Sequence, residues 1–464
     1  MCGIVGVCSP SGDAVALAYP ALVTLQHRGE ESWGVAATTA GGVTGVRSLG
    51  LAASPADGLP AGRAEIAVAH TRYSTTGAPL VENSQPLVAD PSRTLAVAHN
   101  GNITNADELV RDLTAEGYRL TSTTDSETIL GLLACAGTDD PVAAVAHAAD
   151  RIEGAYSVVA LFGRSLLAFR DPAGFRPLFL GQTGDAMIVA SETCALDVLD
   201  CVDQREVEPG ELLVLEPGRE PESFPVVEPG PRHFCAFEYV YLARRDSRLG
   251  GRRVELVREQ LGEELAREAP ADADVVVSVP ASGTPAARGY ARAAGLPFVD
   301  ALVRNDYIGR TFIEPEPSLR ELSLRIKFNV ADGVRGERVV VVDDSIVRGS
   351  TMREVVRRLR AAGASELHLR IAAPPLVSPC YYGVDIADPS ELVAAQHDPA
   401  ELAAYFGADS LEYLSLDGLR RTLTGGTKRG ICVACLTGRY PLAPEAPLDK
   451  LRLALARGDA NAAA

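Results

Sequence analysis

The stretch VVVVDDSIVRGST, residues 339–351, contains a strand pattern, a loop and the start of a helix in one short run. The four valines predict a strand that is buried on both faces. Asp343 and Asp344 follow directly, and a helical pattern covers 350–362. In an open α/β sheet, ligands bind at the carboxyl ends of the strands. The stretch therefore predicts a parallel sheet with a ligand site at this edge.

The residue types of the loop indicate the class of ligand. Backbone N–H groups from Ser345 to Thr351, with the hydroxyls of Ser350 and Thr351, are suited to hold a phosphate at a helix N-terminus. Adjacent carboxylates repel phosphate, but they suit ribose hydroxyls or Mg²⁺ held between a carboxylate and the substrate. A phosphorylated ribose with a metal-bound pyrophosphate fits both parts of the pattern. No G-x-x-x-x-G-K-[ST] run occurs, so this is not an ordinary nucleoside triphosphate loop.

Strand and helix patterns alternate around this stretch. A long helical pattern over 252–268 leads to the apolar run DADVVVSVP (272–280), and ELHLRIAAPP (366–375) follows the phosphate loop. Strands that are apolar on both faces and alternate with helices predict an α/β domain with a doubly wound, mainly parallel sheet.

The first part of the chain has a different pattern. Short β-type runs such as TLAVAHNGNIT (94–104) end in turn residues, and helical segments interrupt them near 104–117 and 125–136. Asn105 and Asp125 are residue types at which helices start. Strands and helices without regular alternation predict a layered α+β domain.

A boundary separates the two patterns. The stretch 208–234 is crowded with proline, glycine and glutamate, which is typical of a linker or a long crossing connection. We therefore expect one domain over residues 2–228 and a second over residues 229–464. A chain of 464 residues is long enough for two hydrophobic cores.

Composition excludes some classes of function and location. Lysine and arginine total 44 against 61 aspartate and glutamate, a net charge of −17, which argues against a nucleic-acid or membrane-surface binder. The start lacks a basic segment, and no apolar run reaches the ~18 residues of a membrane span. We expect a cytoplasmic protein with no nucleic-acid or membrane partner. Its nine cysteines are then not a disulfide framework.

The amino terminus, MCGIVGV (1–7), raises two interpretations. If Met1 is removed, the thiol and the free α-amino group of Cys2 belong to one residue, which combines a nucleophile and a base. The alternative is a small residue that leads into a buried strand, Ile4 to Val7. The motif alone is too short to decide between them.

Motifs spread along the chain resemble the amidophosphoribosyltransferase family, whose second substrate is phosphoribosyl pyrophosphate (PRPP). With 339–351, they are MCGIVGV (1–7), LQHRG (25–29), HTRYST (70–75), HNGNITN (99–105), TTDSE (123–127), FRDPAGFRPL (169–178), EYVYLARRDS (238–247) and YIGRTFI (307–313). The resemblance implies an N-terminal-nucleophile glutaminase domain with a four-layer αββα sandwich. It also implies a type I phosphoribosyltransferase domain that ends in a cluster-binding segment.

The resemblance also implies the reaction. Glutamine is hydrolysed at Cys2, and the ammonia passes internally to C1 of PRPP to give 5-phosphoribosylamine, glutamate and pyrophosphate. This is the first step of de novo purine biosynthesis. Glutamine and PRPP are the expected small-molecule partners, Mg²⁺ and a [4Fe–4S] cluster the expected cofactors, and a homotetramer the expected assembly.

Individual residues match the family's functional positions. In the glutaminase half, Asn100 and Gly101 match the oxyanion hole, Arg72 the residue that binds the α-carboxylate of glutamine, and Asp125 the one that binds its α-ammonium group. In the other half, the residues expected to bind PRPP or its Mg²⁺ are Ser282, Arg304, Tyr307, Arg310, Asp343, Asp344, Ser345, Arg348, Gly349, Ser350 and Thr351. Ser282, Asp343 and Asp344 are the expected Mg²⁺ ligands, and Arg304, Tyr307, Arg310 and Thr311 belong to the segment that resembles a closing lid.

Four cysteines are candidates for a metal centre. Cys432 and Cys435 form C-x-x-C, while Cys235 and Cys380 are isolated in the sequence. By count and spacing alone, four thiolates suit Zn²⁺ and a [4Fe–4S] cluster equally. The motifs CAFEY, SPCYYG and CVACLTGRYP resemble the cluster-bearing branch of the family, which implies a cluster with a structural role.

The chain departs from the family pattern at a few positions. Ala281 stands where the pyrophosphate loop usually has an acid, and Asp306 replaces a cation before GRTFI. Arg245 and Glu30 also differ from the usual residues. These changes keep two other interpretations open: a specialised paralogue that delivers ammonia to a different phosphorylated acceptor, and a non-catalytic PRPP-sensing regulator.

Overall fold

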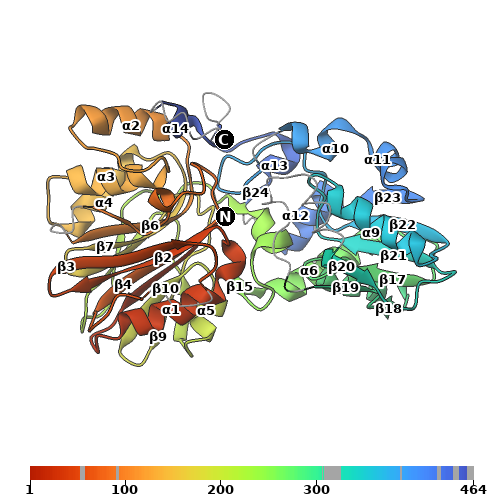
Figure 1. The fold of residues 1–464 in the computed structure, drawn as a ribbon, viewed down its shortest axis with the longest axis horizontal. Coiled ribbons are helices and arrows are strands. Elements are labelled where there is room, and N and C mark those ends of the chain that lie inside the picture. Colours follow the sequence, from red (N-terminus) through yellow and green to blue (C-terminus); the bar gives the residue numbers. More distant parts are fainter. Residues whose placement is uncertain are drawn as a thin grey trace.

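The computed structural model shows two halves that lie side by side, with the amino terminus at the junction between them (Figure 1). It describes residues 1–52, 58–89, 94–305, 307, 326–386, 389–425, 430–442 and 449–456. Two antiparallel sheets form the first half, and a parallel sheet forms the centre of the second.

The two sheets of the first half contain most of its strands. The seven-stranded sheet has the order β11-β9-β10-β1-β4-β2-β3, and the six-stranded sheet has the order β13-β12-β8-β7-β6-β5. The first is built from β1 (Gly3–Cys8), β2 (Ser32–Thr39), β3 (Gly42–Leu49), β4 (Ile66–Arg72), β9 (Phe179–Thr183), β10 (Ala186–Ala190) and β11 (Val202–Glu206). The second is built from β5 (Leu87–Val88), β6 (Leu95–Ile103), β7 (Gly154–Phe162), β8 (Ser165–Arg170), β12 (Glu211–Leu215) and β13 (Glu222–Pro225).

Helices cover the outer faces of these sheets (Figure 1). The seven-stranded sheet contacts α1 (Ala14–Thr24) and α5 (Thr193–Asp197), whereas the six-stranded sheet contacts α3 (Ser126–Cys135) and α4 (Pro141–Arg151), with α2 (Ala106–Ala115) packed on α3. Between the sheets lies an apolar core to which both contribute. The predicted four-layer αββα sandwich is therefore confirmed.

Some local features of this half were not predicted from the sequence. Helix α1 had no predicted counterpart, because its residues are mostly apolar or small on every side and Pro20 lies inside it. β12 and β13 form a hairpin within the expected linker 208–234, since the apolar side chains of β12 pack beside β8. The predicted helix starts are confirmed, since α2 follows Asn105 and α3 follows Asp125, although neither side chain caps its helix and the Asp125 carboxylate accepts the Ile103 N–H at 2.8 Å.

The second half has the predicted parallel sheet, in the order β18-β17-β21-β22-β23. Its strands are β17 (Val275–Ser278), β18 (Phe298–Val299), β21 (Arg338–Asp343), β22 (Glu366–Ile371) and β23 (Ser410–Tyr413). The helices around it are α6 (Val254–Glu268), α7 (Thr284–Ala294), α9 (Ser350–Ala361), α11 (Pro399–Phe406) and α12 (Leu416–Thr424). Val340 and Val342 join the core that includes α6 and α7, while Val339 and Val341 join the core that includes α9 and α11. This explains why all four valines of the strand are buried.

Shorter elements join the two halves. The π-helix η4 (Glu238–Leu242) follows β14 (Phe234–Cys235), which pairs in parallel with β24 (Ile431–Cys432). Near the carboxyl end, α14 (Arg452–Ala456) returns to the first half, where Arg452 donates to the Ile103 carbonyl at 2.9 Å. Residues late in the chain therefore pack on the glutaminase-like half.

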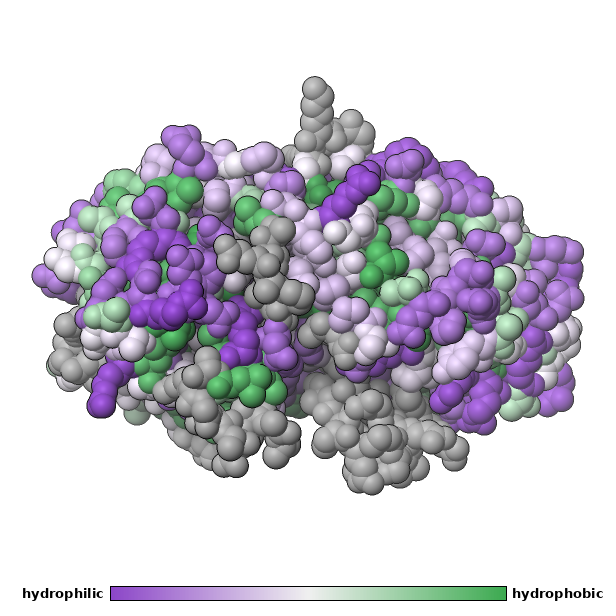
Figure 2. All heavy atoms as spheres, turned by 90° about the horizontal axis from the view of Figure 1, so that it is seen from above, coloured by the Kyte–Doolittle hydropathy of each residue, from purple (hydrophilic) through white to green (hydrophobic). Residues whose placement is uncertain are grey.

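The surface in Figure 2 is mostly hydrophilic over both halves, with hydrophobic residues in small separate groups. Within the described ranges, the structure holds no helix long and apolar enough to span a bilayer.

Candidate active sites

A cavity of about 260 Å³ lies at the carboxyl end of β21. It is the edge at which α/β sheets bind ligands. Most of the residues predicted for PRPP or Mg²⁺ line this cavity: Ser282, Arg304, Asp343, Asp344, Ser345, Arg348, Gly349, Ser350 and Thr351. The structure thus brings together a loop, a helix start and two separate segments that the sequence places far apart.

The two carboxylates of this cavity are almost fully buried, with Asp343 7% and Asp344 5% exposed. Burial, and then the charge of Asp344, raise the pKa of Asp343 well above its ordinary value. Burial also raises the pKa of Asp344, although hydrogen bonds from Ser282 and Ser345 and the charge of Arg258 act in the opposite direction. Adjacent buried carboxylates are costly unless a cation or several donors compensate them. The pair therefore suits a divalent cation or the hydroxyls of a ribose.

The helix start beside these carboxylates is shaped by glycine. Gly349 has a φ of +75°, and a Cβ at this position would lie 2.8 Å from the ring of Phe406. A left-handed conformation and this close approach both require glycine. Because α9 begins at Ser350, the unpaired N–H groups of its first turn lie at the cavity, where an anion can accept them.

Three cationic side chains, Arg304, Lys327 and Arg348, belong to the lining. Arg304 was predicted, whereas Lys327, which also lines the cavity, was not. Burial raises the pKa of Asp343, and the positive charge of Lys327 partly offsets this increase. A single lysine just before the short strand β20 (Phe328–Val330) has no motif that would have identified it. Arg348 is held by Glu391 at 2.5 Å.

The remaining predicted positions and the positions that depart from the family pattern do not contribute to the cavity lining that the structure describes. Tyr307 is 98% exposed and does not line it. Arg310, Thr311 and Asp306 lie outside the described residues. Ala281 is exposed and absent from the lining, although Pro280 and Ser282 on either side belong to it. The missing acid at 281 therefore removes no side chain from the cavity wall as it stands here.

Cys2 lies immediately before β1, in the first half, and is 9% exposed. Its N–H donates to Asn100 Oδ1 at 3.3 Å, and its thiol contacts the Tyr73 carbonyl at 3.6 Å. β1 pairs with β4 in a register that sets Gly3 opposite Thr71. Arg72 and Tyr73, which follow Thr71, are therefore brought close to the thiol.

Next to Cys2 lies an unused hydrogen-bond donor. Asn100 is fully buried, and its Nδ2 has no hydrogen-bond partner among the described residues. Gly101 follows with a φ of +154°, and a Cβ there would fall 1.9 Å from the Ala155 carbonyl oxygen. Only glycine fits this position. A buried amide donor with no partner beside a thiol is what an oxyanion hole needs.

The two residues predicted to bind glutamine are also buried near Cys2. The Arg72 guanidinium donates to the carbonyls of Thr76 and Ala78 at 3.0 and 3.1 Å. Burial lowers the pKa of Arg72, and the charges of Glu31, Cys2 and Asp125 partly restore it. Mutual electrostatic influence of this kind requires these groups to be close. Glu31, 3.8 Å from Arg72, was not anticipated.

Met1 lies between the two sites. Its amino group donates to the Tyr73 carbonyl at 3.3 Å, and its Sδ lies 2.8 Å from the Arg176 guanidinium. The buried Met1 also lines the cavity of Asp343 and Asp344. While Met1 is present, the Cys2 nitrogen is an amide and has no basic lone pair.

The structure brings two of the four cysteines predicted for a metal centre into register. Cys235 pairs with Cys432 across β14 and β24, and the Tyr382 N–H contacts Cys380 Sγ at 3.4 Å. Burial raises the pKa of Cys435 well above its ordinary value, and the other three thiols raise it further. Within the ranges that the structure describes, no three His, Cys, Asp or Glu side chains are placed to hold a metal ion.

Comparison with known proteins agrees with this geometry. The glutamine amidotransferase domain family matches residues 70–198, and the phosphoribosyl transferase domain family matches residues 252–393. An amidophosphoribosyltransferase of Archaeoglobus fulgidus is 43% identical over 452 residues, which cover 95% of this chain and 98% of that protein. One from Mycobacterium tuberculosis is 42% identical over 95% of this chain and 86% of its own length.

The chain belongs to the amidophosphoribosyltransferase family. A solved structure, the glutamine PRPP amidotransferase of B. subtilis complexed with ADP and GMP, matches with a TM-score of 0.88 and 38% identity, over 96% of this chain and 99% of that one. The resemblance stated from the motifs is thereby confirmed, as are both predicted folds. As a member of the amidophosphoribosyltransferase family, the chain is an enzyme of purine biosynthesis that uses glutamine to aminate PRPP.

Proposed function

We propose that this chain hydrolyses glutamine at Cys2 and passes the ammonia directly to C1 of a PRPP molecule bound at the carboxyl end of β21. One observation carries the proposal: the cavity lined by Asp343 and Asp344 is also lined by Met1, the residue bonded to Cys2. The nucleophile and the acceptor site are therefore neighbours, and ammonia need not cross bulk solvent between them.

The glutaminase step uses residues of the first half. Removal of Met1 gives Cys2 a free α-amine, whose ordinary pKa of about 7.7–8.0 suits it to accept the thiol proton. The thiolate attacks the side-chain amide carbon of glutamine, and Asn100 Nδ2 and the Gly101 N–H stabilise the oxyanion. The amine then protonates the departing nitrogen, and ammonia leaves. Water hydrolyses the thioester to glutamate and restores Cys2.

Glutamine itself is held by its charged ends in this proposal. Arg72 binds the α-carboxylate, and Asp125 binds the α-ammonium group. Burial lowers the pKa of Arg72, which means that its positive charge is poorly solvated. A substrate carboxylate would compensate this charge, which supports the proposed role. The pair fixes the substrate so that its amide carbon meets the thiol.

The phosphoribosyl half binds PRPP through the residues that line the cavity. We assign the N–H groups and hydroxyls of Ser345–Thr351, with Arg348, to a phosphate group, and Asp343 and Asp344 to the ribose hydroxyls. The carboxylates and Ser282 form an all-oxygen donor set that fits Mg²⁺, which when bound would neutralise the leaving pyrophosphate. Arg304 approaches the same pyrophosphate, and Tyr307 and Arg310 belong to the proposed lid.

Cys235, Cys380, Cys432 and Cys435 are proposed to hold a [4Fe–4S] cluster. By count, four thiolates suit Zn²⁺ and a [4Fe–4S] cluster equally, and the resemblance of the surrounding motifs to the cluster-bearing branch of the family favours the cluster. Cys235 and Cys432 are register partners, and the other three thiols help raise the pKa of Cys435. Its role would be structural, since it would join β14, β24 and the loop at Cys380.

Three further features are part of the proposal and rest on sequence patterns and family resemblance. They are a division of the chain into domains at residues 228 and 229, a homotetrameric assembly and a cytoplasmic location.

The test is product analysis with the processed chain, glutamine, PRPP and Mg²⁺. We expect glutamate and pyrophosphate in equal amounts, and pyrophosphate from PRPP with added ammonium salt when glutamine is omitted. Glutamate without pyrophosphate would favour the specialised paralogue and contradict the proposal. PRPP binding without glutamate release would favour the regulator.

A further inference from the structure

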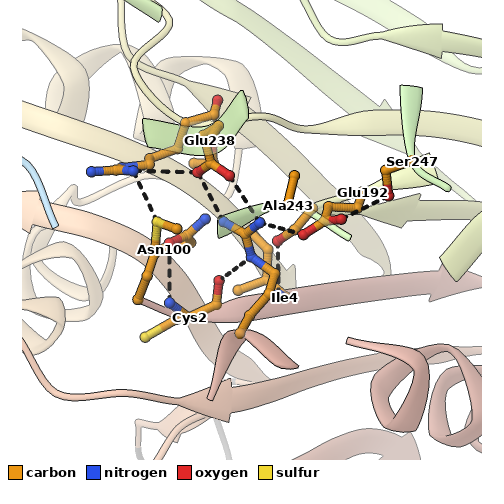
Figure 3. A network of polar contacts seen from close by, with 12 residues as sticks. Cys2, Ile4, Asn100, Glu192, Glu238, Ala243 and Ser247 are labelled. Atoms are coloured by element: carbon orange, nitrogen blue, oxygen red, sulfur yellow. Dashed lines mark hydrogen bonds and ion pairs between the residues drawn. The ribbon is translucent and has the colours of Figure 1, made fainter. Parts of the chain in front are cut away.

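Three of the sequence motifs supply charged side chains that the proposed substrate contacts do not use. Arg28 belongs to LQHRG, Arg176 to FRDPAGFRPL, and Glu238 to EYVYLARRDS. In the structure these side chains meet, together with Glu192, in one polar network beside Cys2 (Figure 3). Residues 210 positions apart in the chain contact one another there.

The network is a set of opposite charges with no access to water. Arg28 is 2% exposed, and the other three side chains are fully buried. Arg28 donates to Glu192 at 2.5 Å and to both oxygens of Glu238 at 3.0 and 3.1 Å, while Arg176 donates to Glu238 at 3.2 Å. Two cations and two anions balance. Removing one member would leave the charge of its partner uncompensated, and an uncompensated charge at such depth is very costly.

The charged states of the network follow from its contacts. Burial by itself would lower the pKa of Arg28, but the charges of Glu238 and Glu192 raise it above its ordinary value. Burial would raise the pKa of Glu192, but His27 and Arg28 lower it well below its ordinary value. Arg28 and Glu192 are therefore both ionised at neutral pH.

The network holds the nucleophilic residue by its backbone. Arg28 Nε donates to the Cys2 carbonyl at 2.8 Å, in addition to its contacts with the two glutamates. In the processed chain Cys2 is the terminal residue, so a single peptide bond connects it to β1. The orientation of that peptide sets where the α-amine and the thiol lie. Arg28 fixes the orientation, and Glu238 fixes Arg28 through a two-oxygen contact.

The same glutamate belongs to the segment that lines the PRPP cavity. Glu238 begins the π-helix η4, and Tyr241 and Leu242 at its other end line the cavity with Asp343 and Asp344. π-Helical turns occur frequently at functional sites. Glu238 thus joins the wall of the acceptor cavity to the carbonyl of the nucleophile through a single arginine.

We infer that Glu238 is a positioning residue for the glutaminase reaction: it orients Arg28, which holds the Cys2 carbonyl and thereby aims the nucleophile. The inference rests on the proposed function, because it assumes that Cys2 attacks glutamine. It assigns to the second half of the chain a residue needed by the chemistry of the first half.

The experiment compares Glu238→Gln with wild type and with a matched control. Glutamine has the same shape as glutamate but carries no charge, and its NH₂ group cannot accept a hydrogen bond from either arginine. Because misplacement of a reacting group by about 1 Å costs roughly 10²-fold, we expect kcat for glutamine hydrolysis to fall by that order. The KM for glutamine should change less than about threefold, since Arg72 and Asp125 are intact. PRPP turnover with added ammonia should stay within about twofold, the size of ordinary assay variation.

The control is Glu206→Gln, which removes a carboxylate from another buried arginine of the same domain. Glu206 accepts from Arg170 at 2.7 Å and does not belong to the network around Cys2. This variant should lower thermal stability and leave the kinetic constants for glutamine unchanged. It separates the effect of a lost buried ion pair from the effect of a misplaced nucleophile.

Two outcomes would overturn the inference. One is a Glu238→Gln enzyme with wild-type kcat for glutamine; the other is an equal loss of glutamine-dependent and ammonia-dependent activity, which indicates a structural role only. If Glu238→Gln does not fold, Arg28→Lys keeps the cation and removes the Nε donor, and the same kinetic split is expected. Failure of wild type to hydrolyse glutamine would instead reject the proposed function itself.

Discussion

Asn100→Ala tests the assignment of the oxyanion hole, because its expected effects on activity and on stability differ. The Nδ2 donor has no partner among the described residues, so its removal breaks no hydrogen bond that those residues form. Oδ1 accepts one contact, from Cys2 N at 3.3 Å. Loss of one such bond lowers the free energy of unfolding by about 0.5–1.5 kcal/mol. Loss of one oxyanion donor costs about 2.7–4 kcal/mol in the transition state, a decrease in kcat of roughly 10²–10³.

The assay measures glutamate release, ammonia-dependent pyrophosphate release and denaturant unfolding for the same preparations. Asn105→Ala is the matched control, since Asn105 donates to the Arg151 carbonyl at 2.9 Å and accepts from the Glu153 N–H at 3.0 Å. This control should lose stability and keep its glutaminase kinetics. A kcat of Asn100→Ala that falls less than about tenfold, well short of the cost of a lost oxyanion donor, would refute the role of Asn100 in the oxyanion hole. A parallel fall in ammonia-dependent activity would refute it as well.

Three other predictions concern processing, the cysteines and the buried carboxylates. Intact-mass analysis should show that the active chain begins at Cys2, and Cys2→Ala should abolish glutamine use but keep ammonia-dependent synthesis; retained Met1 in active enzyme would contradict the mechanism. Anaerobically purified protein should contain about four irons per chain, the content of one [4Fe–4S] centre, and Cys435→Ser should lower iron content and thermal stability together; one equivalent of zinc would contradict this. Folding raises the pKa of Asp343 above the value of about 3.9 that an aspartate has in an unfolded chain. The folded state therefore binds this proton more tightly than the unfolded state does. As a result, the ligand-free enzyme should gain stability as pH falls through the folded-state pKa of Asp343. Asp343→Asn should accordingly raise the melting temperature near pH 7, remove this pH dependence and abolish pyrophosphate release. A lower melting temperature of this variant in calorimetry would contradict the expected cost of burying the Asp343 carboxylate.

The loop proposed to bind phosphate is the part of the structure that local sequence predicts best. Strand, carboxylates, loop and helix start are contiguous in 339–351, and the backbone conformation that joins them depends on near neighbours. The alternation of the valines between two cores then follows from the strand period. Lys327 in the same cavity could not be predicted in this way, because its position depends on a segment that returns from elsewhere in the chain.

Side-chain roles that depend on long-range pairing were predicted less well. Asp125 has the residue type and position of a helix cap, yet its carboxylate accepts the N–H of Ile103 in the neighbouring strand. Similarly, β12 and β13 occupy a stretch whose composition is typical of a linker. In both cases a tertiary contact outweighs the local preference, since burial against a sheet contributes more than a single cap or turn.

The sequence by itself determined the two fold classes and predicted the chemistry of the loop at 339–351, because these depend on residue types in short patterns, whereas the role predicted for Cys2 came from the resemblance of motifs spread along the chain. Only the tertiary structure decided which charges face one another. Arg28 and Glu238 are separated by 210 positions, and nothing in either motif names the other as its partner. That Met1 and Asp343 line one cavity is likewise a property of how the two halves pack. Pairing across such distances is set by the burial of whole sheets and helices, which local sequence does not encode.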